Sequence, residues 1–268
     1  MNATGDCATI ERGLPPAAAA NTCNDGAYHM TDIQKRFETE IAEMVKACHR
    51  CAEVGFVQSQ GGNLSQRVGE DLVLITPTKM NKADIQFDDI CVVTMDGKTV
   101  YAPDGGKPTG ELPFHLRILK SRPDIRAIVH AHPPVLTGFA INGGDWLKRP
   151  YLPEPVLEVG PMVLVPYAEP LSEELACSFD AVIETSNGFL MQNHGALMCS
   201  VESAKRAQEL LEMVEAQAKS LVVAIALGGA RTLPEADVRN LERTLKTRGQ
   251  CLPCAPGKAG GLIELMFD

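Results

Sequence analysis

The chain has 268 residues, of which 45% are apolar and 22% charged, and its 34 acidic and 25 basic residues give a net charge of −9. This composition is sufficient for one large globular domain, and it excludes a collagen-like or wholly disordered chain. No apolar stretch approaches the ~20 residues that cross a bilayer. The chain is acidic, and its sequence shows no cluster of basic residues of the kind that binds nucleic acids. We therefore expect neither membranes nor nucleic acids as partners.

Nine cysteines at irregular spacing do not form the pattern of a disulfide framework, which indicates reduced thiols in a cytoplasmic protein. Two Cys-x-x-Cys pairs, Cys48/Cys51 and Cys251/Cys254, raise the alternative of one zinc site built from four thiolates. The first pair lies inside a helical pattern, and the second lies in a segment rich in Pro and Gly near the other end of the chain. We expect ordinary core and surface thiols at all four positions.

The first 28 residues are rich in Ala, Pro, Asn and Gly and show no hydrophobic periodicity. They lack the cationic start and apolar run of a secretory signal peptide. Residues 1–28 are therefore predicted to form a disordered leader. The main domain is predicted over 29–229, and a C-terminal helix and tail over 230–268.

Order is predicted to begin with the capping-box pattern from Thr31 to Gln34, which opens an amphipathic helix over about residues 32–54. Thr109 is placed to cap a later helix. Further predicted elements are strands at 72–76, 90–94, 127–131, 162–165 and 188–192, and helices at 111–121, from 172, at 200–227 and at 234–246. Helices that interleave with β runs of mixed length are typical of an α/β protein with a central sheet.

Two histidines lie two residues apart at the end of a predicted strand, in the sequence Val129-His130-Ala131-His132-Pro133. Alternate residues of a strand point to the same face, so both imidazoles project together and can share a metal ion. The alternative is a pair of hydrogen-bonded histidines at the edge of a sheet. A third ligand decides between the two interpretations.

His194 is the candidate third ligand, because an apolar run ends at Asn193-His194-Gly195 as a buried strand does where it leaves a sheet. Three neutral imidazoles leave a zinc ion one open coordination position, which is the arrangement of a catalytic site. Glu111, at the start of the helix before the histidine strand, is the candidate acid or base. By itself, an acidic residue in a first helical turn is usually a surface residue that complements the helix dipole.

Together these segments resemble the class II aldolase and adducin family, typified by the zinc-dependent L-fuculose-phosphate aldolases. The resemblance covers about residues 32–228 and depends on several short segments in the family's order. These segments are Gly62-Asn63-Leu64-Ser65, Leu74-Ile75-Thr76-Pro77-Thr78, Glu111 to His115, His130-Ala131-His132 and Asn193-His194-Gly195.

The resemblance implies a three-layer α/β/α fold around a mixed, largely antiparallel sheet of nine strands, assembled as a homotetramer with sites at subunit contacts. It implies a divalent metal ion, usually Zn²⁺ with Mn²⁺ or Co²⁺ as alternatives, held by His130, His132 and His194. Glu111 then resembles the family's catalytic acid or base.

Three other aromatic or imidazole side chains have weaker counterparts in the family. Tyr151 falls near a tyrosine that a neighbouring subunit supplies to protonate the leaving aldehyde oxygen. Tyr167 is expected to be a packed aromatic with a bonded hydroxyl. His115, four residues after Glu111 on the same helix face, is expected to support the site or the fold and not to bind the metal.

The family's phosphate-binding positions combine loop amides, hydroxyl groups and a helix N-terminus, all of which suit an anion. In this chain they fall on Gly62, Asn63, Thr78, Lys79, Thr109 and Gly110. The sugar-phosphate aldolases typically carry Gly where Lys79 stands and a Ser pair where Thr109-Gly110 stands. Lys79 either strengthens phosphate binding as a point charge or selects a carboxylated substrate.

The resemblance implies retro-aldol cleavage of a ketose 1-phosphate to dihydroxyacetone phosphate and an aldehyde, through an enediolate. Two alternatives within the family are decarboxylation of a 3-keto acid or its phosphate and 4-epimerisation of a pentulose phosphate. Decarboxylation comes first of these, because Lys79 changes the anion-binding loop. A different class is an adducin-like binding module without enzymatic activity, but such proteins lack the metal ligands that this chain keeps.

Overall fold

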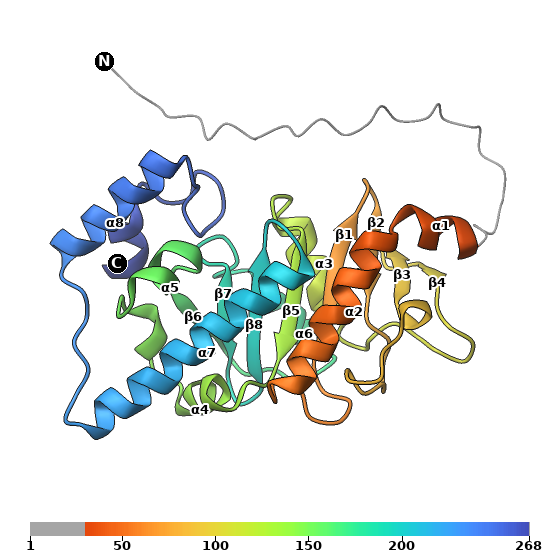
Figure 1. The fold of residues 1–268 in the computed structure, drawn as a ribbon, viewed down its shortest axis with the longest axis horizontal. Helices are drawn as coiled ribbons and strands as arrows, with labels where there is room; N and C mark the ends of the chain where they lie inside the picture. Colours follow the sequence, from red (N-terminus) through yellow and green to blue (C-terminus); the bar gives the residue numbers. More distant parts are fainter. Residues whose placement is uncertain (1–29, 268) are drawn as a thin grey trace, which may run out of the picture.

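The structure, a computed structural model, describes residues 30–267, so the predicted leader over 1–28 lies outside the described residues. An eight-stranded sheet forms its centre, in the order β4-β3-β2-β1-β5-β8-β7-β6 (Figure 1). The strands are β1 (Asn63–Val68), β2 (Leu72–Ile75), β3 (Cys91–Thr94), β4 (Thr99–Tyr101), β5 (Ala127–Ala131), β6 (Met162–Val165), β7 (Gly188–Met191) and β8 (Gly195–Ser200). The α-helices are α1 (Met30–Arg36), α2 (Glu38–Glu53), α3 (Leu112–Ser121), α4 (Pro134–Asn142), α5 (Pro153–Glu158), α6 (Glu173–Cys177), α7 (Ala204–Ala226), α8 (Glu235–Arg248) and α9 (Leu262–Phe267), and the 3-10 helices are η1 (Phe87–Asp89) and η2 (Trp146–Lys148).

The sheet is mixed and largely antiparallel, as expected, because only β6 and β7 pair in parallel. Within the described residues it has eight strands, which corrects the nine that the resemblance implied. An additional pairing after β2 is confined to one isolated bridge between Pro77 and Pro108. Proline has no backbone N–H to extend a ladder, so this pairing stops at one bridge.

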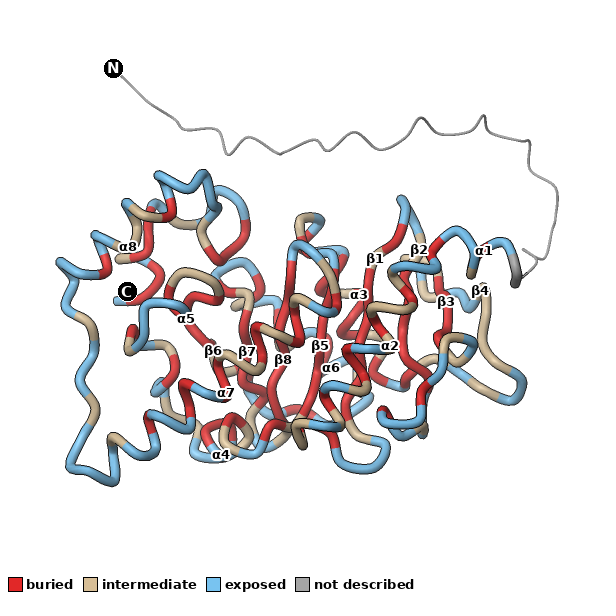
Figure 2. Tube along the Cα trace, viewed as in Figure 1, coloured by how far each residue is buried: buried red, intermediate tan, exposed pale blue. Residues whose placement is uncertain are grey.

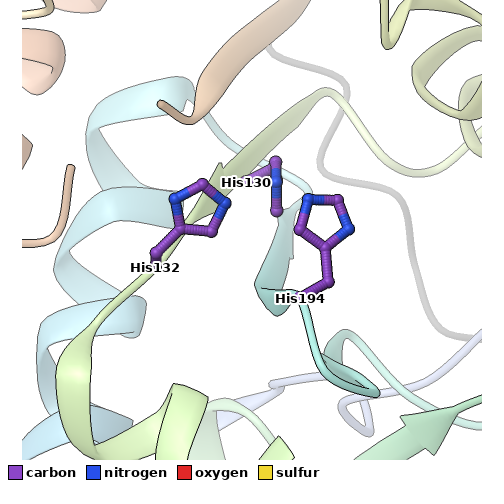
Figure 3. Close-up of side chains that lie close together, drawn as sticks. All are labelled: His130, His132 and His194. Carbon is purple, nitrogen blue, oxygen red and sulfur yellow. The ribbon is translucent and has the colours of Figure 1, made fainter. Parts of the chain in front are cut away.

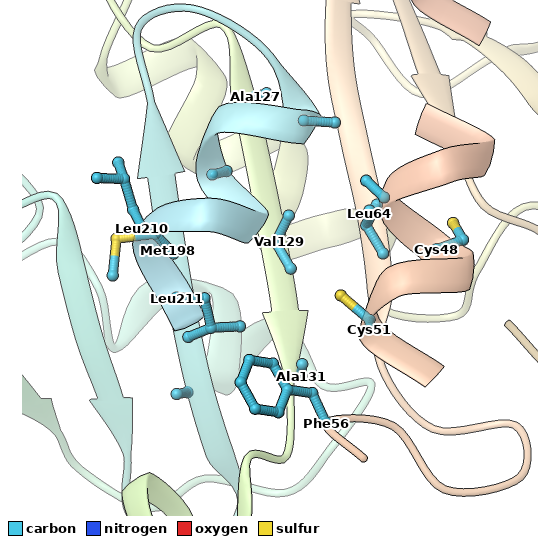
Figure 4. Close-up of a cluster of buried hydrophobic side chains, with 14 of the residues drawn as sticks. Cys48, Cys51, Phe56, Leu64, Ala127, Val129, Ala131, Met198, Leu210 and Leu211 are labelled. Carbon is cyan, nitrogen blue, oxygen red and sulfur yellow. The ribbon is translucent and has the colours of Figure 1, made fainter. Parts of the chain in front are cut away.

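Helices cover both faces of the sheet and make three layers. α2, α4 and α7 lie over one face, and the larger hydrophobic core fills the space between them and the strands (Figure 2 and Figure 4). α3 and α6 pack together, and a second core contains apolar side chains from both of these helices and from the opposite face of the sheet. This arrangement confirms the predicted α/β class and its α/β/α layering.

The alternation of side chains along β5 decides which way its histidine points. Val129 and Ala131 belong to the core under α2 and α7, whereas Ile128 belongs to the core under α3. A period of two residues therefore directs His130 toward α3 as well. Its ring contacts Phe114 of α3 edge-on, with 5.7 Å between ring centroids.

Several elements differ from the sequence-based expectation. The single helix predicted over 32–54 is two helices, α1 and α2, separated at Phe37. β1 was not predicted, because its start at Gly62-Asn63 has the composition of a turn, and Gly62 indeed has a φ of 68°. α4 was not predicted either, because Pro133-Pro134 was taken only as the end of a strand, although proline is also favoured in a first helical turn.

The C-terminal helices α8 and α9 pack with α5 around a small third core, at the left of Figure 1. The division of the chain at 229/230 stays a prediction. None of the described helices is long and apolar enough to cross a membrane.

Within residues 30–267 the cysteine pairs form no candidate metal site. Cys251 is disulfide-bonded, which corrects the thiol expected at this position. Cys48 and Cys51 are free thiols buried in α2, whereas Cys254 belongs to the third core. Burial raises the pKa of the Cys48 thiol to about 12, so this thiol stays protonated at neutral pH. Over residues 30–267, the candidate metal-binding group is made of histidines, not cysteines.

Candidate active site

Three imidazoles from adjacent strand ends face one another in Figure 3. His130 is on β5, His132 follows the end of β5, and His194 lies in the turn between β7 and β8. β5 pairs with β8 as far as Ala131 and Ala196, so the two strand ends meet. Centroids of the three rings lie 4.7, 4.9 and 5.5 Å apart, and one nitrogen of each lies within 4.8 Å of the others. We call these three residues the histidine triad.

The free nitrogens of the triad fit a divalent metal ion. The Nδ1–H group of His130 donates to the carbonyl oxygen of Ala196 at 3.0 Å, which leaves Nε2 with a lone pair. This Nε2 atom and Nε2 of His132 are buried and have no hydrogen-bond partner in the part of the chain that the structure describes. The His194 nitrogen that faces His130 in Figure 3 is Nε2, which lies 3.5 Å from Oε1 of Glu111. Buried polar atoms without partners are uncommon, and three neutral imidazoles are a ligand set of catalytic zinc sites.

Burial keeps the triad uncharged. It lowers the pKa of His130 well below its usual value, and the neighbouring imidazoles His132 and His194 act in the same direction. Burial and then His194 lower the pKa of His132 to about 4. The pKa of His194 is also lowered by burial, although Glu111 opposes this shift. Neutral imidazoles can bind a cation without first losing protons.

Gly195 permits the close approach of the two strand ends. A Cβ atom at this position would lie 2.6 Å from the carbonyl oxygen of Ala131 and 2.6 Å from Cδ2 of His132. Contacts of this length are not tolerated, so the backbone or the His132 ring would have to move.

We expect Gly195→Ala to lower the free energy of unfolding by about 1–3 kcal/mol and to weaken metal binding, because the imidazoles separate. Urea unfolding and metal content after dialysis measure the two effects. Gly138→Ala in α4 is the matched control, since nothing lies within 4 Å of its added Cβ. Alanine favours a helix over glycine by about 1 kcal/mol, so this control should be neutral or stabilising. Unchanged stability and metal content in Gly195→Ala would contradict the close-packing role.

Glu111 lies beside the triad at the start of α3, where it is the N-cap residue. Its Oε2 atom is 3.4 Å from Nε2 of His130, and its Oε1 atom is 3.5 Å from Nε2 of His194. The amide Nδ2 of Asn63 donates to Oε2 at 2.7 Å, and the Glu111 backbone N–H donates to the Thr109 hydroxyl at 3.3 Å. Glu111 is 7% exposed and its carboxylate faces the imidazoles, unlike a surface residue that only complements a helix dipole.

The six predicted substrate-binding residues lie on three segments that meet beside the triad. Asn63 pairs with His130 in the register of β1 and β5. The backbone N–H of Thr78 donates to the carbonyl of Lys107 at 2.9 Å, and that of Thr109 donates to the carbonyl of Thr76 at 3.0 Å. The loop after β2 is thereby tied to the segment that leads into α3. The structure thus brings the three segments together, and their role in substrate binding stays a prediction.

Two of these residues have conformations that bear on the substrate. Lys79 is exposed and has a φ of 56°, a left-handed conformation that favours glycine. A Cβ atom at Gly110 would lie 3.0 Å from Cδ2 of Leu171, a tight contact with the far end of an exposed side chain. Leu171, which the sequence analysis did not single out, is 62% exposed and has a φ of 69°.

Among the described residues, neither Tyr151 nor Tyr167 forms a side-chain hydrogen bond to the triad. Tyr151 is half-buried and packs against the larger core, and its predicted role at a neighbouring subunit stays a prediction. Tyr167 is 56% exposed, so the expectation of a packed aromatic was wrong. It lies in the loop after β6, outside the layers that bury other aromatic side chains.

The sequence analysis missed one polar residue near Glu111. Ser65 is fully buried on β1, and its hydroxyl lies 2.7 Å from Nδ1 of His115. The available signal was the alternation of Asn63 and Ser65, two polar residues that a strand directs to the same face.

Comparisons with known proteins agree with this geometry. The profile of the Class II Aldolase and Adducin N-terminal domain matches residues 42–222. A 3-oxo-tetronate 4-phosphate decarboxylase of Haemophilus influenzae is 30% identical over 221 residues, which cover 80% of this chain and 98% of that protein. An L-fuculose phosphate aldolase of Methanococcus maripaludis is 32% identical over 177 residues, 65% of this chain and 93% of that protein. The crystal structure of YgbL from Escherichia coli matches with a TM-score of 0.70 at 25% identity, over 76% of this chain and 98% of YgbL. The chain belongs to the class II aldolase and adducin family.

Proposed function

We propose that this protein is a cytoplasmic, metal-dependent enzyme that decarboxylates a phosphorylated 3-oxo sugar acid. The observation that carries the proposal is the match to 98% of the length of a 3-oxo-tetronate 4-phosphate decarboxylase. Family membership alone admits several reactions, so this match raises decarboxylation above the aldol cleavage that the sequence analysis placed first.

The proposed cofactor is one Zn²⁺ ion, with Mn²⁺ and Co²⁺ as alternatives, held by His130, His132 and His194. When bound, such an ion polarises a substrate carbonyl and stabilises the negative charge that develops on its oxygen as a neighbouring carbon–carbon bond breaks.

The proton transfer falls to Glu111. As the bond between C2 and the carboxyl carbon of a 3-oxo acid breaks, its electron pair moves toward the C3 carbonyl, and CO₂ leaves. C2 then needs a proton. We propose that Glu111, whose Oε2 atom lies 3.4 Å from Nε2 of His130, delivers this proton in its protonated form and regains it from water. The bond from Asn63 fixes the direction of this carboxyl group.

The phosphate of the substrate is proposed to bind at the loop after β2 and the start of α3. Thr78 and Lys79 are exposed polar side chains there, and Asn63 and Thr109, which each make one bond to Glu111, keep a donor for the phosphate. Lys79 supplies a positive charge, and backbone amides near Gly110 supply hydrogen-bond donors. We further propose a homotetramer in which Tyr151 approaches the site of a neighbouring subunit.

Aldol cleavage is the second candidate function. It is favoured by the 32% identity to an L-fuculose phosphate aldolase and by the same triad and glutamate, which could also serve that reaction. Both reactions break a carbon–carbon bond next to a carbonyl and leave the same kind of charge to be stabilised.

Parallel assays on the zinc-loaded protein distinguish the two reactions. We expect CO₂ release from 3-oxo-tetronate 4-phosphate and no dihydroxyacetone phosphate from L-fuculose 1-phosphate. If L-fuculose 1-phosphate gives dihydroxyacetone phosphate and the 3-oxo acid releases no CO₂, the protein is an aldolase and the proposal is wrong. If neither product forms although the protein holds one metal ion per chain, both proposed substrate classes are overturned.

A further inference from the structure

Behind Glu111, a row of buried polar side chains extends into the space between the sheet and α3. Asn63 bonds to Glu111 through Nδ2, and its Oδ1 atom lies 2.5 Å from Nε2 of His115. Nδ1 of His115 lies 2.7 Å from the hydroxyl of Ser65. Asn63 is 4% exposed, and His115 and Ser65 are fully buried. We call Ser65, His115, Asn63 and Glu111 the polar row.

The two-residue period of β1 and the four-residue spacing along α3 place these side chains next to one another. Asn63 and Ser65 are two residues apart on β1 and point to the same face of the sheet. Glu111 and His115 are four residues apart at the start of α3 and lie on the same side of the helix. Gln66, the next residue of β1, points the other way and accepts a hydrogen bond from the backbone of Ala204.

Only one set of donors satisfies the whole row. Burial lowers the pKa of His115 to about 3, so this ring is neutral and carries one N–H group. The Glu111 carboxylate must accept, so Asn63 presents its NH₂ group to it and its carbonyl oxygen to His115. His115 therefore carries its proton on Nε2, and the Ser65 hydroxyl donates to Nδ1. Each member fixes the orientation of the next.

We propose that Asn63, held by His115 and Ser65, is a positioning residue that aims the Glu111 carboxylate at the substrate carbon above the triad. Within the row the Asn63 amide gives one of its two N–H groups to Glu111 and its oxygen to His115. The expected loss of kcat when Asn63 is replaced rests on the proposed function. The expected displacement of the Glu111 carboxylate does not.

A crystal structure of the Asn63→Leu protein tests the structural consequence without substrate. Leucine has nearly the shape of asparagine but offers no donor to Glu111. We expect the carboxylate to leave its place beside His130 and His194 while the three imidazoles stay where they are. A carboxylate that keeps its place would overturn the proposal, whatever reaction the enzyme catalyses.

Kinetics separate positioning from phosphate binding. We expect Asn63→Leu to lower kcat by about 10–100-fold with little change in KM, as for other residues that orient a catalytic group. A raised KM with unchanged kcat would assign Asn63 to substrate binding and contradict the proposal. Gln66→Leu is the matched control, since it removes a buried amide from the same strand on the opposite face, and its kcat should match the wild type.

Variants of His115 test whether this residue acts through Asn63. They also provide a test of the proposal if Asn63→Leu fails to fold. His115→Gln keeps a donor near the position of Nε2 and should retain kcat within a few fold, whereas His115→Leu should lose as much as Asn63→Leu. The double variant should be no slower than Asn63→Leu, because His115 acts through Asn63. The positioning role of the row would be contradicted if the kcat losses of the single variants multiplied in the double variant. It would also be contradicted if His115→Gln and His115→Leu lowered kcat equally.

Discussion

Replacing Glu111 with glutamine is expected to lower kcat by about 10²–10⁴-fold, the range that general acid–base catalysis contributes. Glutamine has the same size and keeps an oxygen that accepts from Asn63, so the fold and the triad should remain intact. It cannot, however, deliver a proton to the carbon that CO₂ leaves. Steady-state assays of the zinc-loaded protein measure the loss, and metal analysis shows whether the ion is retained.

Glu173→Gln is the matched control for this substitution. Glu173 is also a glutamate in a first helical turn, but it is exposed at the start of α6 and has no contact with the triad. Its kcat should equal that of the wild type. If Glu111→Gln retained full turnover, the assignment of the acid or base would be wrong, and a group from a neighbouring subunit, such as Tyr151, would replace it.

Removal of one imidazole is expected to abolish both metal binding and activity. In His132→Asn the remaining pair, His130 and His194, provides two ligands, fewer than the three protein ligands of catalytic zinc sites. We expect metal content to fall from about one ion per chain to near zero after dialysis, and turnover to fall with it. Elemental analysis of protein prepared without chelators gives the metal content.

His49→Asn serves as the control for the histidine substitution. The Nε2 atom of His49 lies 2.8 Å from the carbonyl oxygen of Ile85, and His49 lies outside the triad. Metal content and kcat should therefore stay at wild-type values. Full metal content in His132→Asn would show that the ion binds elsewhere.

The sequence predicted the histidine strand and its ends because several local signals agree there. An apolar run interrupted only by His130 covers residues 127–131, and Pro133-Pro134 cannot continue a central strand. The short turn before Gly195 likewise marked the place of His194. Sites at strand ends can be predicted from sequence, because the candidate ligands are close in the chain to the Pro and Gly residues that mark the ends of the strands.

The supporting contacts could not be predicted in the same way. β1 contains three buried polar residues, Asn63, Ser65 and Gln66, whose partners lie near residues 111, 115 and 204. Only the folded sheet brings these partners together, so the pattern of β1 alone resembles a polar turn. For the same reason the contact of the Asn63 amide with Glu111 was not predicted; the substrate-binding role that the resemblance gave Asn63 stays a prediction.

The neighbourhood of Gly110 shows a second limit. The sequence revealed that a serine of the aldolases is replaced there, but not why. Cδ2 of Leu171, more than fifty positions later, lies 3.0 Å from where a Cβ atom at 110 would stand. Long-range packing of this kind leaves no local signal.

Anomalous diffraction from crystals grown with Zn²⁺, recorded on both sides of the zinc absorption edge, tests the central claim most directly. Our account predicts one strong peak per chain, about 2.0–2.1 Å from one nitrogen each of His130, His132 and His194. A peak at any other group of side chains, or none between these imidazoles, would contradict it.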